Sequence, residues 1–365
     1  MFMKKQLMGL AACALILSSC SQNQEIENYE QLNREEVRLA PYVNKSKASV
    51  MDPTALKDKG FKVFAVQHPN EGVSDYSGLP VSMSNIKESW NDNKWTHDGK
   101  YYWPESKALS FFMVAPYYDS SNPYLTDDAN ANLDITQGAS MTLPVTIKDN
   151  VADQIDILAA SKLNQTRTGP NAATVDFQFK HILSRIGFKA SMDKEDNLKF
   201  KITGLKYSYT SDKVVSGGTY NYTPTITLND NKHQGSDISI GLATQSVILD
   251  NISAAKTLEA TLNNATSYLM ILPQELKAGD IKVKVIYEIA VADGEAAYGD
   301  SKTAEISLPA QTYAMGKAYT HNLKFSKSST GGEDLLEVTF GDVGVEEWDE
   351  QKPGDVNVPK PETQP

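Results

Sequence analysis

The chain has 365 residues, with 46 Asp and Glu against 35 Lys and Arg, so its formal net charge at pH 7 is −11. This length is enough for two domains that each bury a core of their own. The acidic balance argues against a nucleic-acid partner and against adhesion to anionic lipid, because both need clustered Lys and Arg.

Residues 1–19 have the pattern of an export signal. Lys4 and Lys5 precede an apolar run over residues 7–17, which is too short to span a bilayer and typical of a signal-peptide core. Two serines then lead directly to Cys20. This stretch of small residues ending in cysteine resembles the lipobox of bacterial lipoproteins, and the resemblance implies that Cys20 carries lipid and becomes the first residue of the mature chain. The alternative is an ordinary secretory peptide in which the cysteine is incidental.

The cysteine count limits the chemistry of the mature chain. Cys13 lies inside the apolar run, so residues 21–365 contain no cysteine. A disulfide framework, a thiolate nucleophile and a cysteine-ligated metal are therefore excluded there.

A polar tether over residues 21–35 is followed by a short extended segment, VRLAPYVN. Val37, Leu39 and Val43 alternate with other positions, which predicts a strand. Pro41 lacks a backbone N–H and restricts this segment to an edge strand or a loosely paired one.

From residue 60 onward the dominant pattern has a period of two. IKVKVIYEI over residues 281–289 predicts a half-buried antiparallel strand, and LSFFMVA over residues 109–115 is apolar on both faces and predicts a central strand. In LKFKITGLKYSY the apolar set changes parity at Gly204, which predicts a β-bulge or bend. Helical patterns of ten or more residues are hard to find, so the sequence predicts an all-β protein built from β-sandwiches.

The chain divides at its polar and proline-rich stretches. We expect a signal peptide at 1–19, a tether with a first strand at 20–48, an N-terminal β-sandwich at 49–170 and a C-terminal β-sandwich at 171–350. The boundary near residue 170 rests on SKLNQTRTGPNAAT. The Pro-rich tail, residues 351–365, cannot continue a central strand.

Sequence patterns for catalysis are missing. The histidines (His68, His97, His181, His233, His321) are scattered, and the chain has no nucleophile elbow, phosphate loop or dinucleotide fingerprint. His321 shares strand parity with apolar residues, which favours a packed, hydrogen-bonded side chain over a ligand. We therefore expect no enzyme activity, no cofactor and no metal site.

An aromatic cluster has two interpretations. Trp90, Trp95 and Trp103 lie close to several Tyr and Phe residues in the sequence. Exposed aromatic faces suit a sugar-binding platform, and these three are the candidates for glycan contact. The favoured interpretation places them with Phe111 in the core of the first sandwich.

Taken in order, several motifs resemble the fimbrillin family of Bacteroidales, which includes major and minor pilins and their Mfa-like relatives. The resemblance covers about residues 36–350 and is carried by the lipobox, the early strand and the segments GFKVFAV, WTHDGKYYWPESKALSFFMVAPYY, FQFKHILSRIGFKA, SYLMILPQEL, MGKAYTHNLKF and VTFGDVGVEEW. It implies two tandem transthyretin-like β-sandwiches and a subunit of surface pili. It also implies export as a lipoprotein to the outer membrane, proteolytic removal of the N-terminal segment with its first strand, and replacement of that strand by one from a neighbouring subunit.

The resemblance also implies roles for particular residues. The removable strand corresponds to Val37, Leu39, Tyr42 and Val43. Where family members carry an Arg-containing cleavage sequence, this chain has Lys47-Ala48, so Arg38 and Arg34 are further candidates for processing. An uncut subunit would act as an anchor or cap. The alternation Val356-Asn357-Val358 makes the tail a candidate donor strand.

The sequence thus predicts a structural or adhesive fimbrial subunit at the cell surface, whose partners are other fimbrial subunits, the outer membrane through Cys20, and a surface ligand on host or bacterial cells. The alternative is a surface glycan-binding lipoprotein for nutrient capture. A hydrolase on a sandwich scaffold is a third hypothesis, which a pocket with facing carboxylates or a His–carboxylate pair would favour.

Overall fold

The computed structural model describes residues 35–43, 51–118, 134–135, 141–167, 174–194, 198–291, 298–327 and 336–348. Within these residues the chain is all-β, as the sequence predicts, apart from one short α-helix, α2 (Pro53–Lys59), and one 3-10 turn, η1 (Val151–Asp153). In this part of the chain neither helix is long and apolar enough to cross a membrane.

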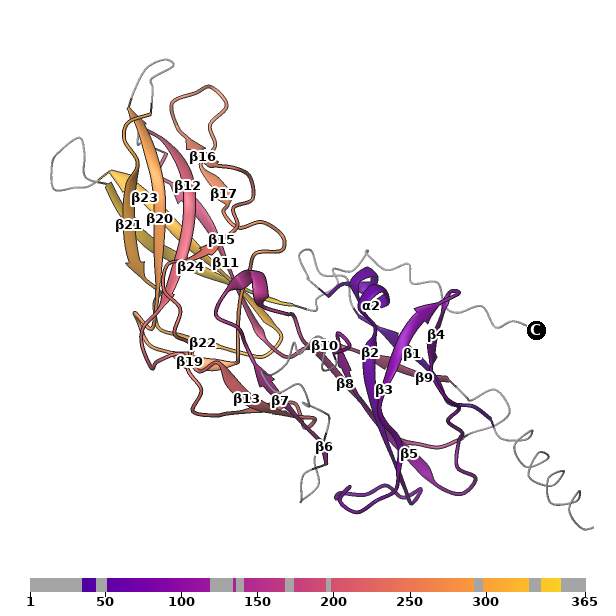
Figure 1. Ribbon diagram of the computed structural model, residues 1–365. Coiled ribbons are helices and arrows are strands. Elements are labelled where there is room, and N and C mark those ends of the chain that lie inside the picture. Colours follow the sequence, from indigo (N-terminus) through magenta and orange to yellow (C-terminus); the bar gives the residue numbers. More distant parts are fainter. Residues whose placement is uncertain are drawn as a thin grey trace, which may run out of the picture.

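The first large element is a six-stranded antiparallel sheet, drawn in indigo to magenta on the right of Figure 1. Its strands, in spatial order, are β10 (Lys180–His181), β8 (Leu158–Gln165), β5 (Ala108–Ala115), β2 (Phe61–His68), β3 (Val81–Asn91) and β4 (Lys94–His97).

Strand β5 is central and buried along its whole length, which confirms the prediction made from LSFFMVA. Alternate β5 residues face opposite sides of the sheet. Phe111 and Met113 belong to one buried cluster, and Phe112 and Val114 belong to another. Both faces of the six-stranded sheet are therefore covered.

One face is covered by α2 and by a two-stranded parallel pair, β1 (Arg38–Tyr42) and β9 (Thr174–Gln178). We call the buried apolar residues between these elements and the sheet the β1 cluster; it includes Val37, Leu39, Val43, Met51, Leu56, Phe61, Val63, Met83, Trp103, Leu109, Phe111, Met113, Val175, Phe177 and Phe179.

Helix α2 begins and ends where the local sequence requires. The Asp52 carboxylate accepts hydrogen bonds from the N–H groups of Thr54 (2.9 Å) and Ala55 (2.8 Å), as an N-cap does. Gly60 follows the helix with a φ of +70°, and a Cβ there would lie 2.4 Å from the Glu88 carbonyl oxygen. Only glycine fits this position.

The opposite face of the six-stranded sheet packs against a four-stranded sheet. This sheet is formed in the order β14 (Thr225–Leu228), β13 (Gly217–Asn221), β7 (Met141–Thr146) and β6 (Asp134–Ile135). The second buried cluster joins the two sheets and includes Phe64, Phe112, Leu143, Val145 and Tyr220. Strand β13 thus brings a later part of the chain beside β7.

Two five-stranded sheets form a β-sandwich, drawn in pink to yellow on the left of Figure 1. One contains β17 (Glu259–Thr261), β11 (Ser184–Met192), β23 (Lys317–Lys327), β24 (Leu336–Glu347) and β18 (Leu269–Ile271). The other contains β15 (Ile238–Ile240), β12 (Leu198–Tyr209), β20 (Ile281–Val291), β21 (Lys302–Ser307) and β16 (Val247–Asp250). A short antiparallel pair is formed by β19 (Gln274–Leu276) and β22 (Gln311–Tyr313).

Strands β12 and β20 confirm two detailed predictions. Along β20, Ile281, Val283 and Val285 are completely buried, whereas the intervening lysines are not. The register between the strands shifts between Ile202 and Gly204, where the change of parity predicts a bulge.

Segments on either side of residue 170 are interleaved. Strands β9 and β10 follow residue 170 but pair with β1 and β8, and β7 precedes it but pairs with β13. The division into domains 49–170 and 171–350 remains a prediction.

Candidate functional site

Strand β1 runs parallel to β9 along one of its edges. Arg38 lies opposite Thr174 in this register, and the N–H of Phe179 donates to the carbonyl of Tyr42 at 2.9 Å. The sequence does not single out β9 as the partner of the early strand, because the β9 run VDFQF has the same alternation as many other strands.

The other edge of the same segment faces residues 101–103. The N–H of Val37 donates to the carbonyl of Tyr101 at 2.8 Å, and the N–H of Trp103 donates to the carbonyl of Glu35 at 3.0 Å. The Glu35 carboxylate also lies 3.0 Å from Nε of Arg167. The segment is therefore held between two parts of the fold that are far apart in sequence.

The side chains of the predicted removable strand divide between core and solvent. Val37, Leu39 and Val43 are 1%, 6% and 5% exposed, whereas Tyr42 is 48% exposed. The Arg38 side chain is also exposed. The three residues whose alternation predicts a strand are therefore the ones that face the core, and Tyr42 has the opposite parity.

The apolar surface under β1 is largely aromatic. Phe61, Phe177 and Phe179 form an edge-to-face triangle, with ring centroids 5.3 to 5.7 Å apart. These rings belong to the β1 cluster with the side chains of Val37, Leu39 and Val43. Removal of β1 would expose this surface together with the bonding edge of β9.

The chain is fixed again at Met51, just after residues 44–50. The N–H of Met51 donates to the Asp156 carboxylate at 3.2 Å, and the same carboxylate lies 2.8 Å from Nδ1 of His181. The His181 ring stacks on Trp348 with a centroid distance of 4.3 Å and an interplanar angle of 3°. The fold is therefore anchored immediately after the segment that contains Lys47.

The processing candidates differ in their surroundings. Arg38 has an exposed side chain, but its backbone lies within β1. A protease needs an extended, unpaired backbone, so a cut at Arg38 requires β1 to leave β9 first. Arg34, Lys47, the lipidation candidate Cys20 and the tail 351–365 lie outside the described residues.

The aromatic residues proposed for glycan contact are partly or fully inside the fold. Trp103 is 4% exposed and belongs to the β1 cluster, so it presents no open face to a sugar. Trp95 is half-buried, with its ring 4.9 Å from that of Phe61. Trp90 is also half-buried, and the Lys57 ammonium lies 4.1 Å from its ring centroid.

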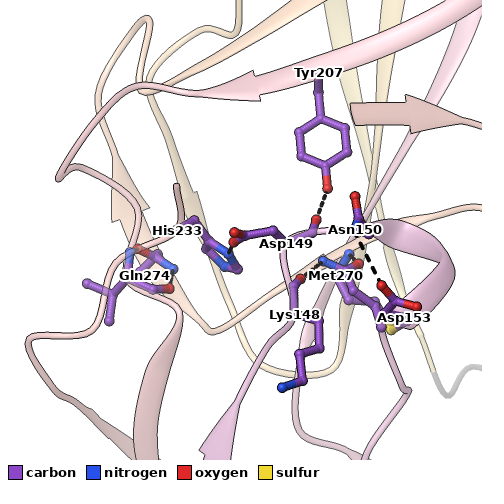
Figure 2. A network of polar contacts seen from close by, with 10 residues as sticks. Lys148, Asp149, Asn150, Asp153, Tyr207, His233, Met270 and Gln274 are labelled. Atoms are coloured by element: carbon purple, nitrogen blue, oxygen red, sulfur yellow. Dashed lines mark hydrogen bonds and ion pairs between the residues drawn. The ribbon is translucent and has the colours of Figure 1, made fainter. Parts of the chain in front are cut away.

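A polar network joins the segment after β7 to β12 and to the loop before β15 (Figure 2). The Asp149 carboxylate lies 2.7 Å from Nδ1 of His233, and the Tyr207 hydroxyl donates to the Asp149 carbonyl. The Gln154 amide donates to the Lys148 carbonyl at 2.9 Å. Burial lowers the pKa of His233, although the hydrogen bond to Asp149 opposes this shift. The network holds residues 148–154 in place.

The other histidines also have polar partners inside the fold. His68 Nε2 lies 2.8 Å from the Ser110 hydroxyl, His97 Nδ1 lies 2.6 Å from the Glu88 carboxylate, and His321 Nε2 lies 2.9 Å from the Tyr313 hydroxyl. His321 is completely buried, which confirms that it is packed and hydrogen-bonded.

The histidine pairs lie outside the pocket beside the β12 bulge. A shallow pocket of about 350 Å³ lies beside the β12 bulge and is lined by residues such as Thr203, Lys206 and Ser239, with no histidine or carboxylate in its lining. No group of three or more His, Cys, Asp or Glu side chains that could hold a metal ion occurs among the described residues.

Comparisons with known proteins give one family match and several solved structures of similar fold. A family model described as Fimbrillin-like matches residues 47–348. A fimbrial protein from Bacteroides vulgatus shares 22% sequence identity, with 86% of this chain and 99% of that chain covered and a TM-score of 0.65. A fimbrial assembly protein from Parabacteroides distasonis shares 12% identity over 86% of this chain and 99% of that chain, with a TM-score of 0.37. A search of curated proteins finds no match.

Proposed function

Since the chain belongs to the Fimbrillin-like family, whose members are structural proteins and not enzymes, we propose that it is a structural or adhesive subunit of cell-surface fimbriae. It is exported as a lipoprotein on Cys20 and assembles by strand donation after its N-terminal segment has been removed. Its described sheets belong to two tandem transthyretin-like β-sandwiches.

The observation that carries this proposal is the position of β1. This strand and the residues that flank it supply Val37, Leu39 and Val43 to a core built by later parts of the chain, and the strand bonds to β9. Each such side chain contributes about 1.5–3 kcal/mol when it is fully buried. A cut on either side of β1 leaves the strand held only by these non-covalent contacts.

Loss of β1 would leave a groove that only another strand can fill well. Its walls are the Phe61, Phe177 and Phe179 rings and the unpaired backbone groups of β9. A strand from a neighbouring subunit would restore both the apolar contacts and the ladder of hydrogen bonds. The tail after Trp348, with Val356 and Val358, is the segment of this chain that we assign to this role.

The anchor at Met51 supports a cut at Lys47. After such a cut the remaining chain is still held through Asp156, so the lipidated peptide and β1 can leave without unfolding α2. Cys20 would then deliver the subunit to the outer membrane and stay behind with the removed peptide. An uncut copy would remain attached as an anchor or cap.

Limited trypsin treatment of the lipid-free chain, carrying Cys20→Ser, tests this function. We expect a new N-terminus within residues 35–48, followed by an SDS-resistant ladder on gels. N-terminal sequencing distinguishes Arg34, Arg38 and Lys47. A protein that is cut in this region and stays monomeric would exclude strand-donation polymerisation.

A further inference from the structure

The backbone of the segment 35–43 has two distinct edges. Odd-numbered residues direct their N–H and carbonyl groups to the edge away from β9, as the bond from Val37 to Tyr101 indicates. Even-numbered residues direct theirs toward β9, as the bond from Phe179 to Tyr42 indicates. The odd-numbered positions are also those whose side chains face the core, at Val37, Leu39 and Val43 in particular.

Pro41 fits this arrangement because it is odd-numbered. Its missing N–H lies on the edge away from β9, so every β1 residue that faces β9 keeps its donor. In β1, therefore, the proline and the buried apolar residues share one parity.

In the tail, residues 351–365, the valines and the prolines have opposite parity. Val356 and Val358 are even-numbered, whereas Pro353, Pro359 and Pro361 are odd-numbered. Whenever the two valine side chains face the core, the prolines therefore occupy the outward-facing positions of the strand.

The direction of a strand decides which edge those prolines occupy. A strand that runs as β1 does, with the valines facing the core, would turn the prolines toward β9, where each removes a ladder hydrogen bond. Suppose that the strand direction is reversed while the valine side chains still face the core. The backbone groups that faced β9 then face away from it, and those that faced away now face β9. The valine N–H groups then face β9, and the prolines face away.

We propose that the tail of a second copy enters the groove left by β1 in the direction opposite to β1, antiparallel to β9. This inference rests on the proposed function and adds the orientation of the donor. Val175 and Phe177 of β9, and Phe179 directly after it, turn both their side chains to the core and their backbone groups to the groove. They can therefore pair directly with core-facing valines, since opposed residues of antiparallel strands share a face.

Crosslinking between two copies tests the orientation, because the chain has no native cysteine after Cys20. Both copies carry Cys13→Ser and Cys20→Ser. The acceptor copy carries Thr174→Cys or Gln178→Cys, at the two ends of β9, and is cut with trypsin. The donor copy carries Asp355→Cys or Asn357→Cys, whose parity places the cysteine on the outward face of the donated strand.

The informative quantity is the ratio of disulfide yield at Thr174→Cys to that at Gln178→Cys. In an antiparallel pair, moving the donor cysteine from 355 to 357 shifts its nearest neighbour by two residues toward Thr174, in every register. We therefore expect the ratio to rise several-fold with Asn357→Cys relative to Asp355→Cys. A fall of the same ratio would mean a parallel donor and would overturn the proposal.

The same samples separate this inference from the proposed function. A normal SDS-resistant ladder without crosslinks at either position would mean that another strand fills the groove, which overturns the role of the tail and leaves strand donation intact. Absence of a ladder after removal of β1 would overturn both. The reduced samples serve as controls, because each cysteine variant must form the ladder of the chain that carries only the two serine substitutions.

Discussion

His321 shows how burial controls the charge of a single side chain in this fold. It is completely buried, with the Tyr313 hydroxyl 2.9 Å from Nε2. Burial lowers the pKa of His321 from its ordinary 6.5 to about 4. The unfolded chain therefore binds this proton more tightly than the folded chain. The stability that comes from the neutral ring is complete above pH 6.5 and is lost as the pH falls from 6.5 to about 4.

We expect His321→Gln to flatten the pH dependence of stability in this window. The loss in the native chain from this one group amounts to about 3 kcal/mol, since one pKa unit corresponds to about 1.4 kcal/mol. Urea unfolding at several pH values between 4 and 7 measures the slope. The variant has a lower stability at neutral pH, so the slope is the quantity to compare. Equal slopes for the two chains would contradict the assignment.

Two positions in β1, Leu39 and Tyr42, allow the loss of buried apolar contacts to be compared with a substitution at an exposed site. Leu39 is 6% exposed and lies in the β1 cluster, whereas Tyr42 is 48% exposed. A buried Leu→Ala change costs about 2–5 kcal/mol, and an exposed change has a much smaller effect. We expect Leu39→Ala to speed the release of the cut N-terminal peptide at least about tenfold, because this cost falls mainly on the docked state of β1.

Gel filtration with mass spectrometry, after trypsin has cut at Lys47, measures that release. Tyr42→Ala is the control and leaves the rate nearly unchanged. If both variants release the peptide equally fast, the apolar contacts of β1 do not hold it in place.

Elements with a strong local signal could be predicted, and weaker ones could not. The alternation of residues 281–289, the apolar run of β5 and the change of parity at Gly204 each correspond to the observed feature. Helix α2 was missed because it has only seven residues, although Asp52-Pro53 and Gly60 are clear helix boundary signals.

The features that could not be predicted from the sequence are contacts between distant parts of the chain. Strand β7 pairs with β13, and β1 pairs with β9, although many other strands have the same alternation. The pairing of His181 with Asp156 joins residues 25 positions apart that share no motif. The early strand of the candidate site could thus be predicted, whereas its partner and its anchor required the three-dimensional structure.

The whole chain is proposed to be a fold with one exchangeable strand, and a reversible lock on β1 tests that claim. Ala40 lies directly opposite Asp176 in the β1–β9 register, and adjacent strands are close enough for a disulfide. The locked chain carries Ala40→Cys and Asp176→Cys together with Cys13→Ser and Cys20→Ser. The chain with Ala40→Cys but native Asp176 is the control.

The decisive measurement is polymerisation of the trypsin-cut locked chain before and after reduction. We predict that the oxidised chain stays monomeric with the β1 peptide attached, and that reduction releases the peptide and produces an SDS-resistant ladder. The control forms the ladder under both conditions. A ladder of equal length in the oxidised locked chain, with the β1 peptide still bound to β9, would contradict the account.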